Sequence, residues 1–108
     1  MLRRYDVLCV GSATVDNFLT IEEKLKNVKV GDKVLVSKIE KQTGGGATNS
    51  AAALSLLGLN VKLLSKLGDD HDADFIEKDL KKYGVKNISL HKSKLNTDSA
   101  TIISRESG

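Results

Sequence analysis

The spacing of hydrophobic positions along the chain predicts several β-strands. The continuous apolar run YDVLCVG, Tyr5–Gly11, is typical of a strand that is buried on both faces of a parallel sheet. Val15–Ile21 and Asp32–Lys41 alternate apolar and polar residues instead, which is typical of a smaller, half-exposed sheet. Further strands are predicted at Asn60–Gly68, Val85–His91 and Ser99–Ser104.

Two segments between these strands have helical patterns. Ala47–Leu57 is rich in Ala and Leu, and Gly58 follows it as a suitable left-handed terminator, with Leu59 placed to fold back onto Leu54. The second helix, Asp69–Gly84, carries acidic residues in its first turn and lysines in its last, as the helix dipole favours. Its two leading aspartates are interpreted as a helix cap and a first-turn acid.

The order of these elements predicts an α/β fold, with a parallel sheet, flanking helices and right-handed crossovers. The two alternating strands interrupt the regular order between the first strand and the first helix, so we expect them to form a second, smaller sheet. A chain of 108 residues suits one small domain or part of a larger one. Because it stops just after a strand, we expect it to be the front portion of a longer protein.

Composition narrows the classes of function. The net charge is +3, from 17 Lys and Arg against 14 Asp and Glu, and the charges are interspersed. Only 4% of the residues are aromatic, so a basic surface with stacking rings is not expected. One cysteine and two separated histidines give no zinc pattern, and no stretch approaches the ~20 apolar residues of a membrane span. We expect a cytoplasmic protein with no metal site and no nucleic-acid or membrane partner.

Three consecutive glycines, Gly44–Gly46, precede the first helix and mark a place where something approaches the backbone closely. The unpaired N–H groups of a helix N-terminus also suit a ligand. A dinucleotide fingerprint would follow the first strand and would need Gly or Ala at position 49, which is Asn49. A phosphate-binding P-loop would end in Gly-Lys-Ser/Thr, which the sequence lacks. Both phosphate motifs are therefore rejected in their usual form.

Recognition of a polyhydroxylated molecule is the alternative. Gly44 and Gly45 would offer bare backbone, and the amide of Asn49 can both donate and accept hydrogen bonds. Asp16 follows the first strand, near the sheet edge where ligands bind in open α/β sheets, and its carboxylate can accept bonds from two hydroxyls. Simpler interpretations stay open: the glycines as a flexible loop, Asn49 as a helix N-cap, and Asp16 as a turn residue.

The motifs VGSATVD, GDKV, TGGGATNSAAALSLLG and VKLLSKLGDD, in this order, resemble the front part of the PfkB-type sugar kinases of the ribokinase-like superfamily. The resemblance spans essentially the whole chain. It implies the N-terminal part of a ribokinase-like three-layer sandwich with a small β-sheet lid, built from about 15–41 and 99–105. It also implies a full-length enzyme that uses ATP, with Mg²⁺, to phosphorylate a hydroxyl group of a sugar or nucleoside.

The resemblance assigns substrate binding to six positions, which are Thr14, Asp16, Gly44, Gly45, Gly46 and Asn49. The residue at Asp16 would bind sugar hydroxyls, and the glycines and Asn49 would line the same pocket. The family often carries Asn where Thr14 stands and Lys where Gly46 stands, so the substrate need not be ribose. We expect Asp16 and Asn49 to converge on one ligand.

The family's catalytic base, anion hole and ATP pocket lie in its C-terminal part, and nothing in Met1–Gly108 matches them. We therefore expect no catalytic residue in this chain and expect the chain alone to be inactive. Two other functions stay open. One is a stand-alone binding module that forms a homodimer through the lid sheet, because exposed edge strands recruit partners. The other is a nucleotide-binding Rossmann-like domain with an atypical fingerprint.

Overall fold

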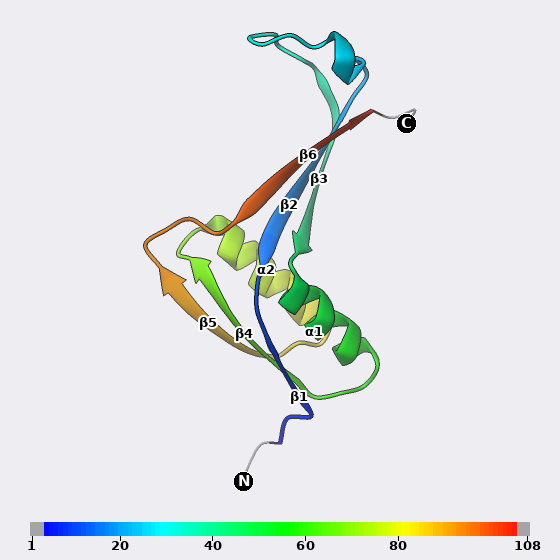
Figure 1. The fold of residues 1–108 in the computed structure, drawn as a ribbon. Helices are drawn as coiled ribbons and strands as arrows, with labels where there is room; N and C mark the ends of the chain where they lie inside the picture. Colours follow the sequence, from blue (N-terminus) through cyan, green and yellow to red (C-terminus); the bar gives the residue numbers. More distant parts are fainter. Residues whose placement is uncertain (1–3, 106–108) are drawn as a thin grey trace.

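The computed structural model describes residues 4–105, which form two sheets and two α-helices (Figure 1). The first sheet is parallel, in the order β1-β4-β5, with β1 (Val7–Val10), β4 (Val61–Gly68) and β5 (Asn87–Ser93). The second has the order β3-β2-β6, with β2 (Thr14–Ile21), β3 (Val36–Gly44) and β6 (Ser99–Arg105). The helices are α1 (Gly46–Leu56) and α2 (His71–Lys82), and the 3-10 turn η1 spans Leu25–Asn27. The predicted α/β fold with a second sheet is confirmed.

Both helices pack on one face of the parallel sheet, because the two right-handed crossovers advance across the sheet in the same direction. Alternate residues of β4 point toward this face, and Val61, Leu63 and Leu67 are at most 3% exposed. Helix α2 contributes Ile76 and Leu80, which are also fully buried. The hydrophobic core therefore lies between the sheet and the two helices.

The opposite face of the parallel sheet is open among the described residues. Leu8 and Val10 of β1 are 56% and 65% exposed, whereas Cys9 between them is buried among core residues, as expected for a small hydrophobic side chain. The prediction that this strand is buried on both faces is therefore wrong for residues 4–105. The physical reason is that the two described helices cover one face only.

Both helices end in a left-handed glycine, which confirms the predicted C-terminal caps. Gly58 has φ 95°, and the Leu59 N–H donates to the Leu54 carbonyl at 3.2 Å. The same arrangement ends α2 at Gly84, which has φ 86°. In each case the left-handed residue turns the chain so that carbonyls of the last turn find donors.

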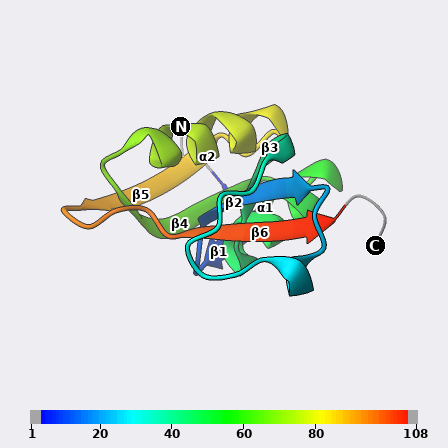
Figure 2. The ribbon, with the colours of Figure 1, turned by 90° about the horizontal axis from the view of Figure 1, so that it is seen from above.

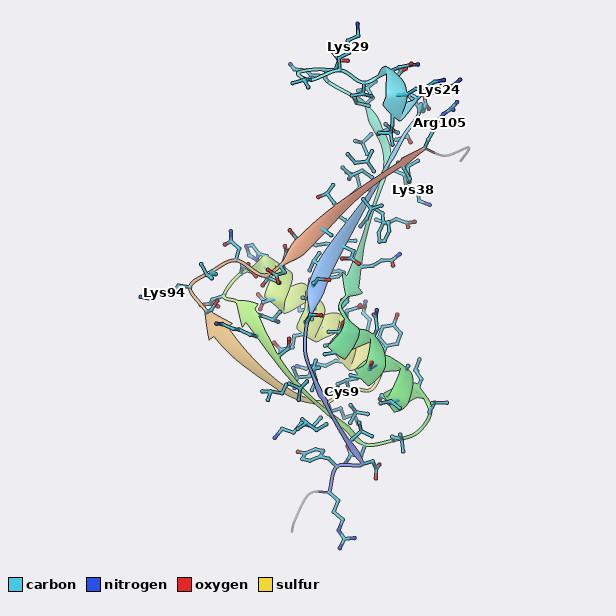
Figure 3. The ribbon with its side chains drawn as sticks, viewed as in Figure 1. Cys9, Lys24, Lys29, Lys38, Lys94 and Arg105 are labelled. Atoms are coloured by element: carbon cyan, nitrogen blue, oxygen red, sulfur yellow. The ribbon has the colours of Figure 1, made fainter. Side chains whose placement is uncertain are left out.

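The second sheet projects away from the parallel sheet as a lid, which we define as β2, β3 and β6 (Figure 1). Strand β2 lies in the middle, pairing antiparallel with β3 and parallel with β6. Seen from above, α2 lies beside the lid strands (Figure 2). Lys24, Lys29 and Arg105 lie at the outer end of the lid, far from Cys9 in the core (Figure 3).

The third strand begins at Val36, four residues later than the sequence pattern predicts. The Asp32 carboxylate accepts the Lys29 N–H at 2.8 Å, and the Asp32 N–H donates to the Lys29 carbonyl at 3.0 Å. Gly31, inside this turn, has φ 89°. These bonds fold Lys29–Asp32 into a turn, and residues 33–35, which follow the turn, lie outside the strand.

Candidate functional site

The connection from β1 to β2 passes directly over the N-terminus of α1. The Gly46 N–H donates to the Ser12 hydroxyl at 3.2 Å, and the Ala47 N–H donates to the Ser12 carbonyl at 3.2 Å. Ser12 therefore caps α1 from outside the helix. Sequence reasoning did not single it out, because its partners lie more than 30 residues away and no local pattern marks them.

The bonds to Ser12 make the N-terminus of α1 less available for binding an anion. Two of its leading N–H groups are already bonded to Ser12, which leaves less of the helix terminus for a phosphate. The N-cap residue is Gly45, and the Asn49 N–H already donates to the Gly45 carbonyl at 3.0 Å. The interpretation of Asn49 as the N-cap is therefore wrong, and its exposed side chain is not used for capping.

Thr14, Asp16 and Gly44 come together at the base of the lid. Thr14 pairs with Gly44 across β2 and β3, and the Thr14 hydroxyl donates to Asp16 Oδ1 at 3.2 Å. A side chain on residue 44 would overlap Asp16 Oδ2 and would lie 2.8 Å from Thr14 Oγ1. Asp16 thus lies inside a strand rather than in a turn, with a half-buried carboxylate that fills the space left by Gly44.

The three glycines have three different surroundings. Gly44 makes room for Asp16, while Gly45 has φ 103° and a Cβ there would lie 2.9 Å from the Ala13 Cα. Gly46 is different, because no atom lies within 4 Å of the position its Cβ would take. The interpretation as a merely flexible loop is therefore wrong for the first two glycines, and only Gly46 leaves open space beside its backbone.

The side chain of Asn49 faces a hollow between β3, α1 and α2, which we call the Asn49 hollow. Its volume is about 620 Å³, and its polar lining includes Gln42, Asp79 and Tyr83. Gln42 is the register partner of Asp16 on β3. The Asp16 carboxylate contacts Thr14 and lies beside Gly44. The expected convergence of Asp16 and Asn49 on one ligand stays a prediction.

Residues 4–105 hold no cluster of three or more His, Cys, Asp or Glu side chains that could bind a metal ion. Over the same residues, neither helix has the length and apolar character needed to cross a membrane. The chemistry that the base of the lid offers is hydrogen bonding: a carboxylate, a hydroxyl and exposed backbone, with the amide of Asn49 on the adjoining helix.

Residues 4–108 match the family described as pfkB family carbohydrate kinases. The chain is similar to the ribokinase of Bacillus subtilis (strain 168), at 33% identity over 81 residues that cover 75% of this chain and 27% of the relative. It is also similar to the ribokinase of Dictyostelium discoideum, at 32% identity over 107 residues that cover 95% of this chain and 32% of the relative.

Solved structures agree with these matches. A carbohydrate kinase from Agrobacterium tumefaciens superposes with a TM-score of 0.81 at 25% identity, over 94% of this chain and 32% of the other. A nucleoside kinase from Methanocaldococcus jannaschii, an archaeal member of the ribokinase family, superposes with a TM-score of 0.77 at 28% sequence identity. The match covers 94% of this chain and 33% of that kinase. A ribokinase from Cryptococcus neoformans in complex with ADP superposes with a TM-score of 0.68 at 27% sequence identity. The match covers 93% of this chain and 31% of that ribokinase.

The chain therefore spans only about a quarter to a third of the length of these five proteins. The resemblance implied the N-terminal part of a ribokinase-like fold, and the neighbours have that fold rather than a dinucleotide-binding one. Since the family match extends over nearly every residue, the chain belongs to the pfkB family of carbohydrate kinases.

Proposed function

We propose that the chain is the sugar-binding part of an ATP-dependent kinase that transfers the γ-phosphate to a hydroxyl group of a sugar or nucleoside. Membership of a carbohydrate-kinase family supports the reaction class. The observation that carries the proposal is the Asp16 carboxylate, which the Thr14 hydroxyl and the space at Gly44 hold at the base of the lid. A carboxylate held in one place is suited to accept bonds from the hydroxyls of a polyol.

Substrate recognition at this site rests on hydrogen bonds. Asp16 Oδ1 accepts the Thr14 hydroxyl, and the remaining lone pairs of the carboxylate are acceptors for substrate hydroxyls. The Asn49 amide on α1 would add a donor and an acceptor, and the open backbone at Gly46 would let the substrate lie close. We propose that these groups bind the substrate and hold its acceptor hydroxyl in one orientation.

The transfer itself depends on positioning and on stabilising the charge of the phosphoryl group. ATP would supply that group, and Mg²⁺ would neutralise charge on its phosphates. The described residues do not fit a metal site, because no cluster of three or more His, Cys, Asp or Glu among residues 4–105 could hold the ion. We therefore assign these residues binding and orientation and derive no transfer step from them.

We also propose that residues 1–108 alone do not phosphorylate a substrate. The proposal is supported by the length of the chain, which spans 32% to 33% of the two kinases that superpose on it with the TM-scores of 0.81 and 0.77. The test compares the isolated 1–108 chain with the full-length gene product, measuring ADP release with a panel of sugars and nucleosides. Release of ADP by the isolated chain above the rate without added sugar or nucleoside contradicts this proposal.

The site assignment is tested with Asp16→Ala in the full-length enzyme. The substrate that the parent enzyme phosphorylates fastest should bind about 1–3 kcal/mol more weakly, because its hydroxyls lose an acceptor. Glu40→Ala is the matched control, since Glu40 is a carboxylate of the lid that is exposed and paired with Lys38 at 2.9 Å. Equal binding by the parent and Asp16→Ala, measured calorimetrically, would rule out the assigned role of Asp16.

The lid also supports a homodimer as a second proposal. One row across the three strands is entirely apolar, with Leu19 paired to Ile39 on β3 and to Ile103 on β6. Ile39 and Ile103 are 69% and 47% exposed, and an apolar hollow of about 220 Å³ adjoins this row. Strands β3 and β6 are also the two edges of the lid sheet, which makes a second copy of the same lid a suitable partner.

Light scattering on the full-length protein tests the homodimer. The parent should have the mass of two chains, and Ile39→Glu should halve it, because a charge would be buried in the shared apolar face. Leu35→Glu is the control, since it adds the same charge to an exposed leucine that precedes β3. A monomeric parent, or a dimer that persists in Ile39→Glu, contradicts the lid interface.

A further inference from the structure

The carboxylate of Asp70 joins two parts of the molecule at the start of α2. Asp70 Oδ1 accepts the Ala73 N–H at 2.9 Å, which caps the helix. The same oxygen accepts the Thr97 hydroxyl at 2.6 Å, and Oδ2 accepts the Thr97 N–H at 2.8 Å. Thr97 is 5% exposed and lies two residues before β6 begins. One carboxylate therefore ties the helix to the chain that enters an outer strand of the lid.

The end of β4 completes this contact. The Gly68 N–H donates to the Thr97 hydroxyl at 3.1 Å, so that hydroxyl accepts one bond and donates another. A Cβ on residue 68 would lie 2.6 Å from the Thr97 nitrogen, which shows how closely the two segments approach. Gly68, Asp70 and Thr97 thus form a clasp of three residues, and the clasp connects the parallel sheet, α2 and the entry to β6.

A second contact ties the other outer strand of the lid to the same helix. Lys41 of β3 places its Nζ 2.7 Å from Asp72 Oδ1 and 5.2 Å from the centre of the Phe75 ring. Because the lid has the order β3-β2-β6, its two outer strands are both held at the N-terminal half of α2. The central strand β2, which carries Asp16, lies between these two attachments.

The two attachments differ in strength. The ion pair of Lys41 and Asp72 is partly exposed, with 38% and 30% of the side chains accessible, and pairs of that kind contribute little. In the clasp, a buried threonine makes three hydrogen bonds, two of them to the charged Asp70 carboxylate. Bonds to a charged group are the stronger kind, so the clasp is the dominant attachment.

We propose that Asp70, acting through Thr97, is a positioning residue that fixes the lid over the substrate site. This inference rests on the proposed function, because the lid matters for catalysis only if Asp16 binds the substrate. Asp70 does not touch the reacting atoms. It determines where β6 enters the lid, and β6 pairs with β2 from Val15, next to Asp16, outward.

The experiment uses the full-length protein and two variants that spare the helix. Asp70→Ser keeps an N-cap side chain but is too short to bond Thr97 as well. Thr97→Val removes the hydroxyl and keeps the shape of the side chain. Asp74→Ser is the matched control, an exposed first-turn aspartate of the same helix. Hydrogen exchange is measured separately for the amides of β6 and of β4.

Both clasp variants should speed exchange of the β6 amides by about tenfold or more. Loss of a hydrogen bond to a charged group raises the equilibrium constant for local opening by at least about that factor. The β4 amides other than Gly68, whose N–H loses its acceptor in Thr97→Val, should exchange as in the parent. Asp74→Ser should leave both sets unchanged. In the enzyme assay, the KM for the phosphorylated substrate should rise while the KM for ATP stays the same. Unchanged β6 exchange in both variants overturns the proposal, and so does an equal increase in β4 and β6.

These readouts separate the inference from the proposed function. If β6 exchange rises as expected but the parent phosphorylates no sugar or nucleoside, the proposed function fails and the clasp stands as an attachment of β6. If the parent is an active kinase and β6 exchange does not change, the function stands and the positioning role of Asp70 is wrong.

Discussion

The Asp16 carboxylate lies in the space that a side chain on residue 44 would occupy. Gly44→Ala should therefore push the carboxylate aside. The new methyl group would meet only side-chain atoms, those of the Asp16 carboxylate and Thr14 Oγ1, and both side chains can rotate away. The free energy of unfolding should therefore change little. Binding of the phosphorylated substrate by the full-length enzyme should weaken by about 1–3 kcal/mol, since the acceptor moves away from its hydroxyls. Calorimetric binding together with denaturant unfolding measures both effects.

Gly46→Ala is the control for the stability measurement. No atom lies within 4 Å of the new methyl group, and the residue is the first of α1, where Ala is a better helix former than Gly. Stability should stay equal or rise slightly. Tight substrate binding by Gly44→Ala would contradict the role given to Asp16, whatever Gly46→Ala does.

Gly45→Ala should damage folding rather than binding alone. Its φ of 103° is strained for any residue with a Cβ, and the added atom would lie 2.9 Å from the Ala13 Cα, which is backbone and cannot turn away. The expected loss in the free energy of unfolding is more than about 2 kcal/mol. Urea unfolding beside the Gly44→Ala variant measures it, and a loss as small as that of Gly44→Ala contradicts the prediction.

Ser12→Ala removes the hydroxyl that accepts the Gly46 N–H at 3.2 Å. The Ser12 carbonyl would still accept the Ala47 N–H, so α1 keeps part of its cap. Loss of a capping side chain typically costs about 1 kcal/mol, and Ser12→Ala should lower the free energy of unfolding by that amount. Ser12→Thr, which keeps a hydroxyl, should retain most of the stability in the same unfolding measurement. Equal losses in the two variants would argue against the cap.

Much of the fold follows from local pattern. The caps at Gly58 and Gly84 need only a left-handed glycine after a helical pattern, and both are visible in the sequence. The order of strands and helices fixes the parallel sheet, because crossovers have one hand. The start of the third strand cannot be predicted from local pattern. The hydrogen bonds between Lys29 and Asp32 form a turn there, and the sequence pattern suits a strand equally well.

The candidate site is less visible in the sequence. The glycines indicate that some group lies close to the backbone, but the sequence does not show that this group is Asp16. The contact between Asp16 and Gly44 results from the pairing of β2 with β3. Ser12 caps α1, and Thr97 bonds to Asp70, through hydrogen bonds to residues far away in the chain. No local propensity encodes such contacts. The pattern predicts a helix from Asp69, with Asp69 and Asp70 as a cap and a first-turn acid, whereas in the structure Asp70 is the cap, α2 begins at His71, and the same carboxylate attaches Thr97.

The exposed face of the parallel sheet leads to a prediction about neighbouring residues of β4. Leu63 is fully buried, and Leu63→Ala should cost about 2–5 kcal/mol in the free energy of unfolding. Leu64 points to the other face and is 41% exposed within residues 4–105. In a three-layer fold that face is covered too, so Leu64→Ala should cost at least about 2 kcal/mol in the full-length protein. A cost near zero, measured by denaturant unfolding, contradicts a third layer over β4.

The pKa of Asp70 lies below its ordinary value, because the Thr97 hydroxyl, the Thr97 N–H and the Ala73 N–H all donate to its carboxylate and outweigh the desolvation. Asp70 therefore stabilises the fold fully above the unfolded-state pKa, about 4, and the stabilisation is lost as the pH falls from there through the lowered pKa of the folded state. Asp70→Asn cannot titrate. The difference in urea midpoint between parent and variant should be constant from pH 7 to 5 and should shrink below about pH 4. A difference that stays constant down to pH 2.5 would mean that the charge of Asp70 does not strengthen the clasp.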